Sequence, residues 1–163
     1  RQRQMCIRDR YRYDNTSKKW QRIKTVKAVS FTDSGLARAK GYSYKVKAVK
    51  KSGGKEYISA SYSKAVEAVT KPAKASCTAK SADSGSIEVS WKAVGGASGY
   101  EIYSSSNGSD YVKSAKVGGS QKSAIVSGFE PYSLRMVKVR AYKTVNGKTS
   151  YGAFSQAVMV IVR

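Results

Sequence analysis

The side chains in this chain that could do chemistry are basic and alternate along two similar segments. Lys45 and Lys47 are two residues apart, and Lys138 and Arg140 repeat that spacing later in the chain. In an extended strand, residues i and i+2 project from the same face, about 7 Å apart. Such pairs attract polyanions, for example wall teichoic acid, acidic glycans or nucleic acid. The alternative is an ordinary solubilising face, because outward lysines also discourage pairing between exposed strand edges.

The residue inventory argues against catalysis and against a metal or cofactor site. The chain has no His, which removes Ser-His-Asp triads, Cys-His pairs and His metal ligands. Gly53 and Gly54, like Gly95 and Gly96, indicate turns, and no phosphate-binding glycine pattern is present. We therefore expect no enzyme activity and no cofactor. Cys77 is expected to be a small half-buried strand residue, and a reactive thiol is the less favoured alternative.

Charge and composition limit the partners. The 163 residues carry 31 Lys and Arg against 10 acids, a formal net charge of +21. Anionic cell-wall or host glycans fit this balance, whereas no groove-reading helix or aromatic RNA-binding motif accompanies the charge. No apolar stretch approaches the roughly 18 residues of a membrane span. Two cysteines, Cys6 and Cys77, are too few for a disulfide framework.

An internal repeat indicates one structural module used twice. Residues 42–55 recur as residues 135–148, and residues 62–66 recur as residues 154–158. In the second copy, alternating apolar residues and turn signals predict about seven strands, near residues 75–80, 87–91, 99–103, 111–117, 124–126, 135–145 and 149–162. Asn146 and Gly147 predict a two-residue hairpin. This spacing is typical of a two-sheet sandwich.

Alternation also predicts a core. The inward positions of the second copy include Trp91, Tyr100, Ile102, Val137, Val139 and Ala141, and Tyr42 and Val46 are their counterparts in the first copy. Trp91 is expected in this core rather than on a ligand-stacking surface. Trp20 aligns with Tyr111 and has no equally fixed place; it is expected to be a packing residue, and a sugar-binding platform is the alternative.

These residues carry a resemblance to a known family. The second copy resembles a fibronectin type III module. Its amino-acid sequence also resembles the Lys- and Tyr-rich type III repeats of surface proteins from Gram-positive gut anaerobes. The match rests on Trp91, on the Gly99-Tyr-x-Ile-Tyr103 motif, on Phe129-x-Pro131 and on Val137-x-Val139-x-Ala141. It covers residues 73–163 fully and residues 11–72 in part. The resemblance implies an all-β fold of immunoglobulin-like sandwiches in tandem.

The repeat also sets the expected domain organisation. Residues 73–163 form a complete module, and residues 11–71 form a partial one that lacks its first two strands, so we expect the partial module alone to be marginally stable. Residues 1–10 resemble a translated sequencing-adapter scar, and the alternative is a native basic tail. We expect the chain to be a fragment of a longer protein.

One position departs from the family pattern. The resemblance places a Tyr six residues before the Ala of the long strand. The first copy has Tyr42 there, whereas the second has Arg135. A buried Arg is costly, so either Arg135 reaches outward or Tyr132 substitutes from a shifted position.

The resemblance implies a non-catalytic, extracellular module of a bacterial surface or secreted protein, which spaces or presents neighbouring domains or takes part in adhesion. We expect it to be monomeric. The alternative is a module that binds polyanions or cell-wall glycopolymers through Lys45, Lys47, Lys138 and Arg140.

Overall fold

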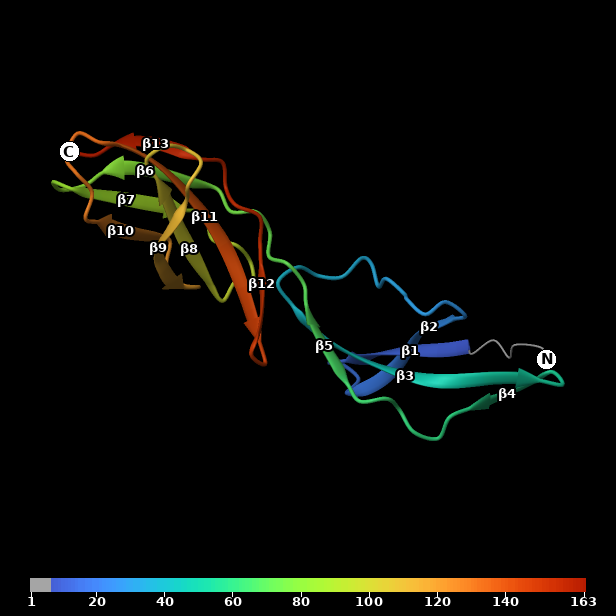
Figure 1. Ribbon diagram of the computed structural model, residues 1–163. Coiled ribbons are helices and arrows are strands. Elements are labelled where there is room, and N and C mark those ends of the chain that lie inside the picture. The colour runs from blue at the N-terminus through green and yellow to red at the C-terminus, as the bar shows by residue number, and fades with distance from the viewer. Residues whose placement is uncertain (1–6) are drawn as a thin grey trace. The chain divides into compact units, whose positions relative to one another are not determined.

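The computed structural model describes residues 7–163, which form thirteen strands joined by turns and loops. Unit 1 comprises residues up to 36 together with residues 41–68, and unit 2 comprises residues 37–40 and 69–163 (Figure 1). Across the described part of the chain, no helix is long and apolar enough to span a membrane. Residues 1–6 of the tail expected at residues 1–10, Cys6 among them, lie outside the described residues.

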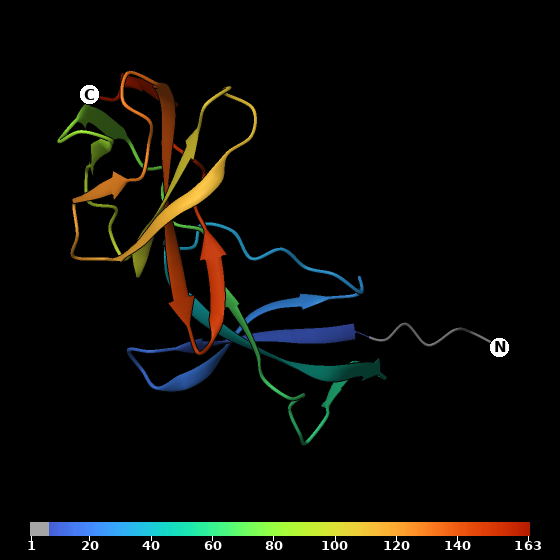
Figure 2. The ribbon, with the colours of Figure 1, turned by 60° about the vertical axis from the view of Figure 1, so that its left-hand side comes forward.

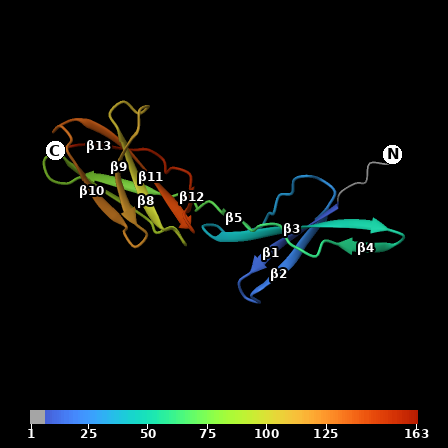
Figure 3. The same ribbon diagram turned by 60° about the horizontal axis from the view of Figure 1, so that its bottom comes forward.

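Unit 1 is built on one sheet of five strands. They are β1 (Ile7–Asp14), β2 (Lys19–Val26), β3 (Gly41–Ser52), β4 (Lys55–Ile58) and β5 (Val66–Val69). The order is β2-β1-β3-β4, and β5 also pairs with β3. Figure 3 shows β4 returning along β3 as a hairpin.

Unit 2 contains two sheets. The smaller has the order β10-β7-β6, formed by β6 (Cys77–Ser81), β7 (Ser86–Trp91) and β10 (Ser123–Ser127). The larger has the order β12-β11-β8-β9, and β13 also pairs with β11 (Figure 2). Its strands are β8 (Gly99–Ser105), β9 (Val112–Gly118), β11 (Leu134–Val145), β12 (Lys148–Tyr151) and β13 (Val158–Ile161).

The hydrophobic core of unit 2 lies between these two sheets. Alternation along β7 directs Ile87, Val89 and Trp91 inward, where they pack with inward residues of β8 and β11. Their partners are Tyr100, Ile102, Val137, Val139 and Ala141, each with 0% of its surface exposed. The polar ends of the two large aromatics are satisfied, as burial requires. The Trp91 indole donates to the Gln121 carbonyl at 3.1 Å, and the Tyr100 hydroxyl accepts from the Val94 amide at 2.7 Å.

The sheet of unit 1 repeats the larger sheet of unit 2 strand for strand. Asp9 stands opposite Lys47 in unit 1, as Glu101 stands opposite Arg140 in unit 2. Arg10 likewise faces Val46 where Ile102 faces Val139. The strands β1 to β5 therefore correspond to β8, β9, β11, β12 and β13. We call the face that bears Ile102 and its counterparts the inner face, and the opposite face the outer face.

Two sequence interpretations need correction in unit 1. Residues 7–10, set aside as part of a tail, form the first half of β1, and Asp9 is fully buried there. Their alternation went unrecognised because Arg8 and Arg10 occupy inner positions where apolar residues are the rule. Tyr42 and Val46 were expected in a core, yet both are only half-buried, because the described residues of unit 1 provide no second sheet over the inner face.

The hairpin turns are set by backbone conformation. Asn146 and Gly147 have φ angles of 47° and 76°, and Gly53 and Gly54 have φ angles of 54° and 74°. Two successive positive φ angles match the twist of the flanking strands, so both copies use the same type of two-residue turn.

Arg135, the departure from the family pattern, lies half-buried with its guanidinium carbon 4.9 Å from the centre of the Phe129 ring. Tyr132 does not replace the missing aromatic residue, because it is 87% exposed.

Candidate functional site

The outer face of the larger sheet in unit 2 carries a cluster of charged and aromatic side chains. Arg140, on β11, lies at its centre and donates from Nε and Nη2 to Glu101 Oε2 at 2.9 and 2.7 Å. The Arg140 guanidinium carbon is 4.2 Å from the ring centre of Tyr151 and 4.8 Å from that of Phe154. Aromatic faces attract cations, more strongly when water is partly excluded. Arg140 is therefore held by its acid partner and its aromatic neighbours together.

Glu101 is the charged residue that organises this cluster. Only 1% of its surface is exposed, and Lys113 Nζ approaches its other oxygen at 3.4 Å. Burial alone would raise the pKa of Glu101, but the hydrogen bonds and positive charge of Arg140, followed by those of Lys113, outweigh it and lower the pKa. The carboxylate is thus ionised at neutral pH and neutralised internally.

Unit 1 repeats this cluster on its own outer face. Asp9 takes the place of Glu101, and it accepts from Arg22 Nη1 at 3.2 Å and from the Thr25 hydroxyl. Lys47 takes the place of Arg140, with its ammonium 4.3 Å from the Tyr62 ring centre. Tyr11 and Tyr62 meet edge to face at 5.0 Å, a spacing that Tyr103 and Phe154 repeat at 5.0 Å in unit 2.

The two remaining predicted cations also stack on aromatic rings. Lys45 Nζ lies 4.6 Å from the Trp20 ring centre, and Lys138 Nζ lies 3.7 Å from that of Tyr111. We call the resulting groups the outer clusters. That of unit 1 comprises Asp9, Tyr11, Trp20, Lys45, Lys47 and Tyr62, and that of unit 2 comprises Glu101, Tyr103, Tyr111, Lys138, Arg140 and Phe154.

The structure thus brings the predicted basic residues together in pairs, with a difference between them. Lys45 and Lys47 lie on one face of β3, and Lys138 and Arg140 on one face of β11. The Arg140 charge is matched by Glu101. The ammonium groups of Lys45, Lys47 and Lys138 instead lie against aromatic rings, and Lys47 Nζ also donates to the Ala60 carbonyl at 3.1 Å. These three lysines are half-buried, and each ammonium keeps donors for a ligand.

In each unit, a serine that was not predicted to matter accepts a hydrogen bond from the long strand that carries the cluster. Ser155 Oγ accepts from the Val139 amide at 3.0 Å and donates to the Gln156 carbonyl at 2.8 Å. Ser63 Oγ repeats this, accepting from the Val46 amide at 3.0 Å. The signal was present in the repeat, because residues 62–66 and 154–158 share this Ser. Cys77 is half-buried, and its Sγ lies 3.1 Å from Ser155 Oγ.

No protein-family model matches the chain, and no curated protein matches it significantly. Solved structures do. The FN1–FN3 domains of chicken CNTN1 match 98% of this chain with a TM-score of 0.54 and 20% identity. A two-domain fibronectin type III segment of chicken tenascin matches 96% with a TM-score of 0.56 and 14% identity. An Fn3-like protein from Clostridium thermocellum matches 56% with a TM-score of 0.45 and 18% identity.

This chain spans 54% of the CNTN1 fragment and 83% of the tenascin segment. Because both similarities run through nearly the whole chain, they show its fold, which is that of fibronectin type III β-sandwich modules in tandem.

Proposed function

We propose that this tandem of fibronectin type III-fold modules is a non-catalytic spacer or adhesion segment of a larger bacterial surface or secreted protein. The observation that carries the proposal is the set of interactions that both copies of the repeat share. The positions shared by the two copies are those that hold the sheet: an acid opposite a cation, an aromatic partner for that cation, and the supporting serine. Because the shared residues stabilise the sheet, they support a function that depends on the folded module as a structural element.

A spacer must stay folded while it transmits tension. The test is to pull the chain from its two ends in an optical trap. Unit 2 should unfold in one cooperative event that lengthens the chain by about 300 Å, since an extended residue spans roughly 3.3–3.6 Å. Gradual lengthening without a rupture would contradict the spacer role.

The second candidate function, binding of a polyanion such as a cell-wall glycopolymer, is favoured by one observation. Lys45, Lys47 and Lys138 each stand over an aromatic ring on an outer face. Arg140 is excluded as a test position, because Arg140→Glu would place two carboxylates together and disturb the fold.

The binding test is elution of the chain from immobilised teichoic acid with increasing salt. Lys45→Gln, Lys47→Gln and Lys138→Gln combined should elute at clearly lower salt than the unchanged chain. The matched control combines Lys27→Gln, Lys64→Gln and Lys122→Gln, three exposed lysines outside the clusters, with the same loss of charge. If both triple variants elute together, net charge alone explains retention and the site does not exist.

A further inference from the structure

The two outer clusters differ in whether the central cation of the long strand is neutralised. In unit 2 the Arg140 guanidinium is paired with Glu101 at 2.7 Å. In unit 1, Asp9 stands in place of Glu101, with a side chain that is one methylene shorter. It accepts from Arg22 on β2 at 3.2 Å rather than from Lys47 on β3. Among the described residues, no acid forms an ion pair with Lys47, so this cation is unmatched in unit 1.

Aromatic rings surround the unmatched charge in unit 1. The Tyr62 ring centre lies 4.3 Å from Lys47 Nζ and 5.4 Å from Lys45 Nζ, so the two ammonium groups share one ring. Lys45 Nζ also lies 4.6 Å from the Trp20 ring centre. The Trp20 ring is in turn 6.3 Å from that of Tyr62 and 5.3 Å from that of Tyr13. Two cations and three aromatic rings therefore form one continuous surface on the outer face.

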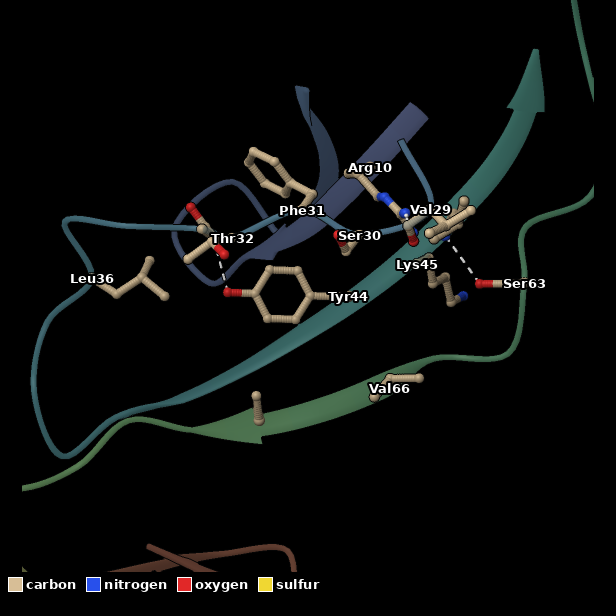
Figure 4. A pocket seen from close by; sticks show the side chains of 13 residues that line it. Arg10, Val29, Ser30, Phe31, Thr32, Leu36, Tyr44, Lys45, Ser63 and Val66 are labelled. Carbon is tan, nitrogen blue, oxygen red and sulfur yellow. Dashed lines mark hydrogen bonds between the residues drawn. The ribbon is translucent and has the colours of Figure 1, made fainter. Parts of the chain in front are cut away.

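The segment that carries Tyr62 is fixed to the long strand β3. The Ser63 amide donates to the Val46 carbonyl at 2.9 Å, and the Ser63 hydroxyl accepts from the Val46 amide at 3.0 Å. Figure 4 shows the second of these bonds beside Lys45. Trp20 is half-buried and Tyr62 is 37% exposed, so a ligand can reach both rings. The aromatic surface is thus held in place, while the flexible lysine side chains can turn on it.

This combination selects a ligand that is both anionic and built of rings. An ammonium group without an acid partner keeps donors for a carboxylate, and a charge-assisted hydrogen bond is a strong one. The C–H groups of a sugar ring carry partial positive charge and lie favourably against the negative face of an aromatic ring. A polyphosphate would satisfy the lysines and leave the rings uncovered, whereas a neutral glycan would cover the rings and leave the lysines unsatisfied. An acidic sugar engages both.

We propose that the outer cluster of unit 1 binds an acidic polysaccharide, with a sugar ring stacked on Trp20 and the sugar carboxylate held by Lys45 and Lys47. Lys45 gives up its place over the Trp20 ring to reach the carboxylate, and at an exposed site the contact it loses is weak. The inference rests on the polyanion function proposed above and narrows it to one unit and one class of ligand.

The first test uses the unchanged chain and follows the quenching of its tryptophan fluorescence by acrylamide. Acrylamide reaches Trp20 far more readily than Trp91, which is only 6% exposed. Polygalacturonate should reduce the quenching constant about twofold, because a stacked sugar ring shields the indole. Inorganic polyphosphate, which has no ring, should give no such protection. Equal protection by the two polymers would overturn the proposal.

Matched pairs of lysines assign the site to one unit. Lys45→Gln with Lys47→Gln should weaken polygalacturonate binding, measured by calorimetry, at least about tenfold, as expected when close charge pairs are lost. The control is Lys116→Gln with Lys138→Gln, which removes the same charge from two lysines that lie over aromatic rings in unit 2. The control should weaken binding less than about threefold, since exposed charges outside the site contribute little. Equal losses in the two double variants would contradict a site in unit 1.

Failure of the polyanion function and failure of this inference give different results. If neither polymer binds the unchanged chain at low salt, polyanion binding itself is wrong. Trp20→Leu should weaken the binding of polygalacturonate and spare that of polyphosphate. If both polymers bind and this variant leaves the ratio of their affinities unchanged, polyanion binding stands and the stacked sugar is wrong. If single-stranded oligothymidylate protects Trp20 more strongly than polygalacturonate does, the cluster binds nucleic acid bases instead.

Discussion

At the scale of single residues, the ion pair between Arg140 and Glu101 explains why a cation recurs at this position of the long strand. Glu101 is nearly inaccessible to water, so it depends on Arg140 and Lys113 for its charge to be tolerated. Part of the basic excess visible in the sequence therefore serves the sheet itself.

Replacement of Arg140 tests this dependence. Arg140→Met keeps much of the side-chain volume but leaves the buried Glu101 with only Lys113 as a charged partner. We expect the free energy of unfolding to fall by about 2–3 kcal/mol at neutral pH, somewhat less than for loss of a fully isolated pair. Lys80→Met, which removes the exposed pair with Glu88, should cost less than about 1 kcal/mol. Chemical denaturation of both variants provides the comparison, and equal costs would show that Glu101 does not need Arg140.

The pH dependence of stability follows from the lowered pKa of Glu101. An acid with a lower pKa in the folded state stabilises the fold above its unfolded pKa, about 4.3 for Glu. That contribution disappears as the pH falls through the lower pKa of the folded state. The stability gap between the unchanged chain and Arg140→Met should therefore narrow below about pH 4. Denaturation curves across this range measure it, and a gap that stays constant would point to packing rather than charge.

At the scale of elements, strand β8 begins at Gly99, where the neighbouring strand and the Tyr142 side chain leave no room for a Cβ. A Cβ at this position would lie 2.3 Å from the Val117 carbonyl oxygen and 2.4 Å from the Tyr142 hydroxyl oxygen. The glycine in the Gly99-Tyr-x-Ile-Tyr103 motif thus permits the close pairing of β8 with β9 and the packing of Tyr142.

The expected effect of Gly99→Ala is a loss of about 2 kcal/mol in the stability of unit 2, because backbone and neighbouring strand must shift to admit the methyl group. Gly95→Ala is the matched control, since no atom lies within 4 Å of a Cβ there. Thermal unfolding of the two variants distinguishes them. A Gly99→Ala protein as stable as the control would mean that β8 and β9 yield without cost.

Elements were more predictable from the sequence than sites. Apolar alternation and turn residues are local signals. They correctly predicted β7, β11 and the turn at Asn146 and Gly147. The pairing of Glu101 with Arg140 joins residues far apart in the chain, so spacing within one segment could not reveal it. The start of β1 was missed because two inner positions, Arg8 and Arg10, break the apolar pattern by which strands are recognised.

At the scale of the whole molecule, the two repeated sheets differ in how many hydrophobic residues are buried against them. Eleven buried residues form the core of unit 2, whereas in the described part of unit 1 only Ile7 and Val49 are buried hydrophobic residues, and both lie on the outer side. Burial of each aliphatic side chain contributes about 1.5–3 kcal/mol. The same strand arrangement is therefore expected to be much less stable in unit 1.

Amide hydrogen exchange of the intact chain tests this account most directly, because it reports the opening free energy of each strand separately. The corresponding strands β1 and β8, and β3 and β11, provide matched pairs within one molecule. We expect the interior amides of β8 and β11 to be protected at least about a hundredfold more strongly than those of β1 and β3, a difference of roughly 2.7 kcal/mol. Equal protection in the paired strands would contradict the claim that an uncovered inner face distinguishes the two copies.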